Sequence, residues 1–113
     1  MEIGARNMTK YSLGSMLRGW YIGPFEPSVL NTSDFELGIK SYAQGEREPR
    51  HVHRVATEVT CVLDGQVRMN ELLLHEGDIV VLEPGESSDF EALTDARIAV
   101  AKMPAVAGDK FEC

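Results

Sequence analysis

The stretch GEREPRHVHRVATEVTCVLDG, residues 45–65, decides how this chain of 113 residues is interpreted. His51 and His53 are two positions apart, so on a β-strand both side chains point to the same face of the sheet. Glu58 follows five positions later, and a glycine stands at each end of the stretch, where turns are expected. Two imidazoles and a carboxylate are ligands for a divalent transition metal, and three such groups leave coordination positions open for water or substrate. The stretch therefore predicts an open metal site carried on strands.

Short apolar runs separated by turn signals extend on both sides of this stretch. Residues 35–42 alternate as a half-buried strand does, whereas residues 79–82 are continuously apolar. The Pro-Gly pair inside Glu83–Glu86 predicts a type II turn. Strands are expected at residues 35–42, 50–55, 58–63, 66–69, 72–74, 79–82, 87–92 and 97–103. About eight short strands without a long amphipathic helix predict an all-β sandwich or barrel.

One turn signal makes a specific prediction about strand pairing. Asp64-Gly65 is a two-residue hairpin sequence, because both central positions of the favoured turn need a positive φ. Residues 66–69 are therefore expected to pair back onto residues 58–63. Asn70 marks the next turn along the chain.

Composition excludes several classes of partner. The net charge is −7, which argues against binding to nucleic acid or to an anionic membrane surface. Cys61 and Cys113 do not form a disulfide framework, and Cys61 is expected in the core. The N-terminus has no apolar stretch after its first charges, and no run approaches the ~18 apolar residues of a membrane span. We therefore expect a cytoplasmic protein with no membrane partner.

The first third of the chain has a different character from the rest. Residues 1–33 are rich in large apolar side chains, which is too much apolar surface for a disordered tail. A helical turn is expected within Ser12–Trp20 and a short strand at Trp20–Ile22. We therefore divide the chain into an irregular N-terminal packing or dimerisation segment, residues 1–33, and a barrel, residues 34–113.

The spacing in residues 45–65 resembles the first motif of the cupin superfamily. Gly45, His51, His53, Glu58 and Gly65 meet every spacing of that motif. The resemblance implies a double-stranded β-helix, or jelly-roll, barrel that is often a homodimer. It also implies that the two histidines and the glutamate hold one divalent metal ion, such as Fe, Mn, Ni, Zn or Cu, at the mouth of the barrel.

The second cupin motif is met only in part. Gly77-Asp78 and the apolar run 79–82 fit it, but Ser88 stands where the family has its fourth ligand, a histidine, and Ala92 where it has asparagine. Serine is a poor neutral ligand for a transition metal. Asp89 would reach the interior only through a β-bulge, and His75 is expected in an exposed turn. The resemblance thus implies an incomplete site of three ligands.

Three kinds of function fit this site. The first is a divalent-metal-dependent enzyme acting on a small molecule by isomerisation, decarboxylation or oxygenation, with His51, His53 and Glu58 as ligands. The second is a metal-free epimerase or isomerase of the sugar type, in which the same three residues provide acid–base catalysis. The third is a non-catalytic module that binds a small ligand. The sequence does not choose among them, since fold alone does not define function.

Two features near the motifs have alternative interpretations. Arg47 and Arg50 either belong to a solvated charged run or lie near the mouth and pair with an anionic substrate. Phe90 shares a strand face with Ser88 and is expected in the core rather than as a ring that stacks on substrate.

Overall fold

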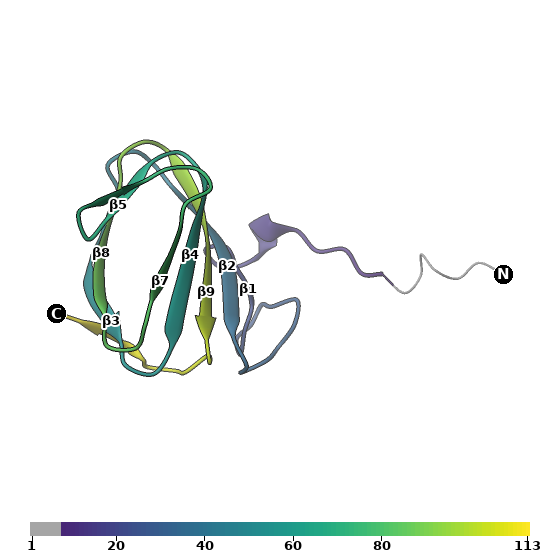
Figure 1. Ribbon diagram of the computed structural model, residues 1–113. Helices are drawn as coiled ribbons and strands as arrows, with labels where there is room; N and C mark the ends of the chain where they lie inside the picture. The colour runs from purple at the N-terminus through teal and green to yellow at the C-terminus, as the bar shows by residue number, and fades with distance from the viewer. Residues whose placement is uncertain (1–7) are drawn as a thin grey trace.

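The computed structural model describes residues 8–113, so the first seven residues of the predicted N-terminal segment lie outside the described residues. Within this range the chain forms two five-stranded antiparallel sheets (Figure 1). Their strand orders are β1-β2-β9-β4-β7 and β10-β3-β8-β5-β6. The strands are β1 (Trp20–Ile22), β2 (Glu36–Tyr42), β3 (Arg47–His53), β4 (Thr57–Asp64), β5 (Val67–Met69), β6 (Leu72–Leu74), β7 (Ile79–Leu82), β8 (Ser87–Ala92), β9 (Ala96–Met103) and β10 (Lys110–Glu112). The predicted all-β architecture is confirmed.

The N-terminal elements agree with the sequence prediction, whereas the C-terminal strand does not. The helical turn expected within Ser12–Trp20 is a single 3-10 turn, Leu13–Ser15, and β1 pairs with β2 at the edge of the first sheet. Strand β10 was not predicted, because three residues show no periodicity that indicates a strand. It forms by pairing with β3, which places Lys110 opposite His53.

The hairpin predicted at Asp64-Gly65 is wrong. Strand β4 pairs with β7 and β9, whereas β5 pairs with β6 and β8, so the chain crosses from one sheet to the other at this point. Gly65 has a φ of 84°, and a Cβ there would lie 2.2 Å from the carbonyl oxygen of Asp95. The absence of a side chain at Gly65 therefore allows its backbone to lie close to the backbone of Asp95. The hairpin in this part of the chain joins β5 to β6. Its turn is at Asn70-Glu71, where both residues have a positive φ.

The core lies between the inner faces of the two sheets. Strand β4 illustrates the pattern, because Glu58, Thr60 and Val62 are buried while the residues between them are half-buried. Cys61 is among these half-buried residues, so the prediction that it belongs to the core is wrong, and both cysteines are free. The buried apolar cluster consists of Val62, Val67, Met69, Leu74, Phe90, Ala92, Ala96, Ile98 and Val100.

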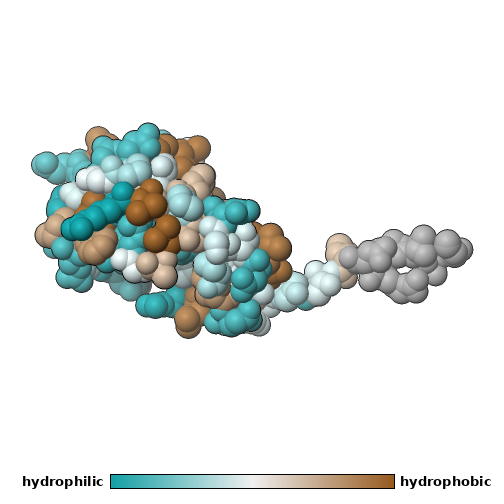
Figure 2. Space-filling model, turned by 90° about the horizontal axis from the view of Figure 1, so that it is seen from below, coloured by the Kyte–Doolittle hydropathy of each residue, from teal (hydrophilic) through white to brown (hydrophobic). Residues whose placement is uncertain are grey.

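On the face of the molecule seen from below, hydrophobic side chains form small groups, and hydrophilic residues separate these groups (Figure 2). Among residues 8–113, no helix has the length and apolar character needed to cross a membrane.

Candidate metal centre

Strands β3 and β4 bring the three predicted ligands together. His51 and His53 lie near the end of β3, and Glu58 lies near the start of β4 after a short connection. All three face the interior, with 7–8% of each residue exposed. Their ligating atoms all lie within 4.8 Å of one another, so the group could hold a metal ion. The spatial grouping expected from the spacing is therefore present.

Backbone carbonyls fix the orientation of both imidazoles. The Nδ1 atom of His53 lies 2.9 Å from the carbonyl oxygen of Asp109, and that of His51 lies 3.2 Å from the carbonyl oxygen of Pro49. Because a carbonyl oxygen only accepts hydrogen bonds, each Nδ1 must be the donor. Each Nε2 is then the atom left to coordinate a metal or to take part in proton transfer.

The contact between His53 and Glu58 joins two groups that both accept hydrogen bonds. Nε2 of His53 lies 3.1 Å from Oε1 of Glu58. With Nδ1 as donor, neutral His53 presents a lone pair at Nε2, and the carboxylate presents lone pairs of its own. A cation is needed between them, and either a proton on Nε2 or a bound metal ion can supply it. The hydroxyl of Thr60 donates to the other oxygen of Glu58 at 3.4 Å.

Glu58 is held in its ionised form. Burial alone would raise the pKa of its carboxyl group, but the hydrogen bond and charge of His53, with further contributions from His51 and Lys102, lower the pKa below the usual 4.5. An ionised carboxylate is the form that coordinates a metal. The electrostatics of the site therefore suit a ligand role for Glu58.

The position of the missing fourth ligand faces the same interior. Ser88 lies directly across from His51 on β8 and is 1% exposed. Its hydroxyl donates to the carbonyl oxygen of Asp89 at 2.7 Å. The side chain of Asp89 instead accepts a hydrogen bond from the backbone N–H of Asn70 and pairs with Arg50. Neither residue completes the site as a fourth ligand in this arrangement.

His75 lies apart from the group of three. It is exposed and its Nδ1 lies 3.7 Å from the carboxylate of Asp78 in the same turn. The exposed position expected for it from sequence is therefore confirmed.

Both arginines that precede His51 point away from the site. Arg47 pairs with Glu91 at 3.4 Å, and Arg50 pairs with Ser87 and Asp89. These pairs lie on the outer side of the second sheet, because Ser88 and Phe90 occupy the buried side of β8. The alternative in which Arg47 or Arg50 lies near the mouth and pairs with an anionic substrate is therefore not supported.

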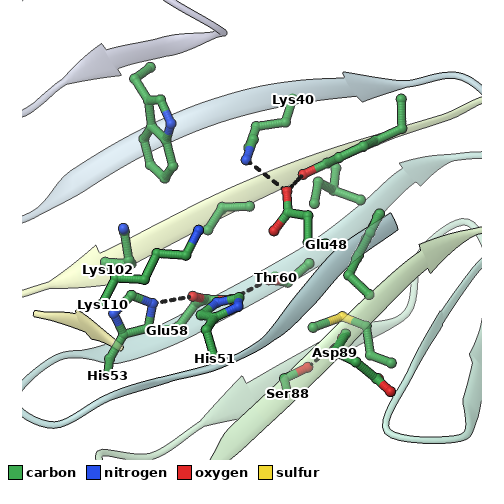
Figure 3. A pocket seen from close by; sticks show the side chains of 16 residues that line it. Lys40, Glu48, His51, His53, Glu58, Thr60, Ser88, Asp89, Lys102 and Lys110 are labelled. Atoms are coloured by element: carbon green, nitrogen blue, oxygen red, sulfur yellow. Dashed lines mark hydrogen bonds and ion pairs between the residues drawn. The ribbon is translucent and has the colours of Figure 1, made fainter. Parts of the chain in front are cut away.

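Three lysines line the site cavity instead, and the sequence interpretation missed them. Lys40, Lys102 and Lys110 all contribute to the cavity that contains the two histidines and Glu58 (Figure 3). Lys102 was recognisable, since it continues the inward-facing positions of β9 after Ile98 and Val100. Lys110 was not, because nothing in the sequence indicated β10.

The cavity that contains the site is small and has one aromatic wall. Its volume is about 50 Å³, and Trp20, Tyr42 and Phe90 contribute to its lining. Phe90 is 5% exposed and belongs to the buried cluster, as expected. Trp20 reaches this position because Gly38 lies opposite it, where a Cβ would be 2.8 Å from the indole ring.

A second polar group closes the far side of the cavity. The hydroxyl of Tyr42 donates to Glu48, whose carboxylate also accepts from Lys40 at 3.1 Å. Burial and the neighbouring Glu48 raise the pKa of Tyr42. Burial opposes ionisation of Glu48, but Tyr42 and Lys40 lower its pKa below 4.5. Lys40 is therefore neutralised by a carboxylate within the cavity wall.

Comparisons with known proteins identify the fold. No protein-family model matches the chain, and no curated protein matches it. An uncharacterised conserved protein with a double-stranded β-helix domain from Klebsiella pneumoniae superposes with a TM-score of 0.67 at 20% identity, over 94% of this chain and 99% of that one. The DMSP lyase DddQ from Ruegeria pomeroyi gives 0.68 at 17% identity, over 82% of this chain and 49% of that one.

An oxalate oxidase in complex with glycolate is similar at a TM-score of 0.57 and 20% identity, over 66% of this chain and 44% of that one. The structural neighbours thus include enzymes that act on small molecules. The chain has the double-stranded β-helix fold of the cupins, so the fold that the resemblance implied is confirmed.

Proposed function

We propose that this protein is a divalent-metal-dependent enzyme that acts on a small molecule, with His51, His53 and Glu58 holding the metal. The observation that carries the proposal is the pair of facing acceptors, Nε2 of His53 and Oε1 of Glu58, 3.1 Å apart. The second imidazole of His51 lies in the same group. A cation shared by these three groups satisfies lone pairs that are otherwise buried together.

The donor set fits an ion such as Fe, Mn, Ni or Zn, which imidazole and carboxylate ligands bind. When bound, such an ion supplies Lewis-acid polarisation of a substrate oxygen. The protein contributes the fixed Nδ1–H tautomers of both histidines and the ionised carboxylate of Glu58. Isomerisation, decarboxylation and oxygenation are the reaction types that remain in the proposal.

One alternative is a metal-free acid–base enzyme, and the same contact favours it. If a proton occupies Nε2 of His53, the residue forms an ion pair with Glu58 and is placed to donate that proton to a substrate. Ser88 in place of a fourth ligand also agrees with this alternative. Turnover that survives exhaustive chelation would favour it over the first proposal.

The test is a metal titration of untagged protein from which metal has been removed. We expect one divalent ion per chain at micromolar or lower concentration, and loss of that binding in His51→Ala and His53→Ala. His75→Ala is the matched control, because it removes the exposed histidine outside the group of three. Equal metal content in His51→Ala and the unchanged protein would contradict the proposal.

The remaining sequence predictions are untested. A homodimer, a cytoplasmic location and a packing or dimerisation role for residues 1–33 stay predictions. Sedimentation of the full chain would decide the first of them.

A further inference from the structure

The strand register places a different side chain across from each of the three proposed ligands. His51 lies between Ser88 on β8 and Glu112 on β10. Lys110 lies opposite His53, and Glu58 lies between Lys102 on β9 and Leu82 on β7. Directly opposite residues in an antiparallel pair have neighbouring side chains on the same face. Two of the three ligands therefore have a lysine among their directly opposite cross-strand neighbours.

These two lysines differ in how their charge is compensated. Lys102 lies 3.6 Å from the carboxylate of Glu36, and its Nζ is 4.9 Å from the centroid of the Trp20 ring. Among residues 8–113, no carboxylate lies within ion-pair distance of Lys110. Lys110 therefore contributes a positive charge to the cavity without a direct ion pair, although this charge helps to lower the pKa of Glu48.

A bound metal would increase this imbalance. Glu58 neutralises only one of the two charges of a divalent ion, and Glu36 and Glu48 are already paired with Lys102 and Lys40. The metal-loaded site would thus retain one metal charge and the charge of Lys110. This positive region stands out in a chain whose net charge is −7. Lys110 is exposed, so water solvates its charge, but an anion that enters the cavity would meet both positive charges.

A second cavity adjoins the site cavity at His53 and the two lysines. It has a volume of about 250 Å³ and shares His53, Lys102 and Lys110 with the site cavity. The remainder of its wall comes largely from the segment Pro104–Asp109 between β9 and β10. Both ammonium groups therefore border the space on either side of His53.

We propose that the substrate of this site is a small dicarboxylate, which presents one carboxylate to the metal and the other to Lys110 and Lys102. This inference rests on the proposed metal-dependent function. Two negative charges match the two positive charges that the loaded site leaves without a partner. Lys110 and Lys102 are then substrate-binding residues, because both line the two cavities, whereas Lys40 does not line the second cavity and is held by Glu48 and Tyr42.

The test is calorimetric titration of malonate and of acetate into full-length protein loaded with one equivalent of Zn²⁺. We expect malonate to bind at least about tenfold more tightly than acetate, and Lys110→Gln to weaken malonate binding about tenfold without changing acetate binding. Lys110→Arg keeps the charge and should retain most of the affinity. Arg47→Gln removes an exposed cation on the outer side of the second sheet and should leave both affinities unchanged.

The Zn²⁺ titration that precedes these measurements separates the two ideas. If Zn²⁺ binds but malonate binds no better than acetate, or Lys110→Gln binds malonate as the unchanged protein does, the dicarboxylate inference is overturned and the proposed metal site stands. If Zn²⁺ does not bind, both are overturned. Inorganic phosphate, titrated in parallel, should bind more weakly than malonate; tighter binding of phosphate would also overturn the inference.

Discussion

The interior of this barrel has an apolar end and a polar end that are built from the same strands. On the β4–β9 pair, Val62 faces Ile98 at one end, and two positions further along each strand Thr60 faces Val100. Two positions beyond that, Glu58 faces Lys102. Strand β8 makes the same change, from Ala92 in the buried cluster to Ser88 opposite His51.

The apolar end contributes mainly to stability, whereas the polar end carries the residues of the proposed function. The apolar end removes side chains from water, which is the dominant favourable contribution to folding. The polar end buries imidazole and carboxylate groups, and this is tolerated only because carbonyls, a hydroxyl, neighbouring charges and a proton or metal ion between His53 and Glu58 satisfy them. Substitutions at the two ends are therefore expected to affect different measurements.

The largest expected effect on stability comes from the apolar end. Leu74→Ala removes a side chain that is 6% exposed and does not line the site cavity. The free energy of unfolding should fall by about 2–5 kcal/mol, measured by urea denaturation, while the protein that remains folded binds Zn²⁺ with unchanged affinity. A loss of Zn²⁺ affinity below the unfolding transition would show that the two ends are not separate.

Asp109 supports the polar end in two ways, because its carboxylate and its carbonyl accept different hydrogen bonds. The carboxylate accepts hydrogen bonds from the backbone N–H groups of Arg54, Val55 and Ala56 at 2.9–3.2 Å, while the carbonyl accepts from His53. Burial would raise the pKa of Asp109, but those backbone donors lower it below 3.8. The side chain thus fixes the turn between the ligands.

Asp109→Asn should therefore affect both stability and metal binding. We expect the free energy of unfolding to fall by about 1–3 kcal/mol and the Zn²⁺ affinity to fall by roughly tenfold, since His53 loses a firmly held partner. Denaturation and metal titration of the same preparation give the two values. Asp78→Asn, in an exposed turn, is the control for the change in charge and should leave Zn²⁺ affinity unchanged. Unaltered Zn²⁺ affinity in Asp109→Asn would contradict the positioning role.

A smaller effect is expected at the aromatic wall of the cavity. In Gly38→Ala the new Cβ would lie 2.8 Å from the Trp20 ring, so the indole must move. The cost should be about 1 kcal/mol. Trp20 is the only tryptophan in the chain, so its emission maximum reports the displacement directly. An unchanged spectrum would mean that the ring does not depend on this close approach.

The smallest effect is the dependence of stability on acid. The folded-state pKa values of Glu48 and Glu58 lie below 4.5, so below this pH the unfolded chain takes up protons that the folded chain does not yet bind. Their contribution is complete above about pH 5 and is lost as the pH falls through the folded-state values. Glu48→Gln should flatten the fall in the free energy of unfolding below about pH 5. Parallel curves for the two proteins would contradict the lowered pKa of Glu48.

The sequence predicted the part of this arrangement that repeats with a period of two. Alternation located the strands and the inward direction of His51, His53 and Glu58. It also placed Ser88 on the buried face of β8. These features depend only on the pleat of a strand, and local residues are enough to determine them.

The features that depend on pairing between distant strands were not predicted. The Asp64-Gly65 hairpin signal was overridden because β4 finds its partners in β7 and β9. Lys110 lies opposite His53 only through the pairing of β10 with β3, and three residues are too few to show a period. The charge around the ligands is therefore a property of the register, which the sequence alone does not reveal.

The most direct test of the central claim is X-ray diffraction from crystals soaked with Zn²⁺, with anomalous differences recorded at the zinc edge. The account predicts one strong anomalous peak within about 2.0–2.2 Å of Nε2 of His51, Nε2 of His53 and a carboxylate oxygen of Glu58. The account would be contradicted if the site showed no peak and His53 and Glu58 remained in direct contact, while zinc appeared only at surface groups such as His75.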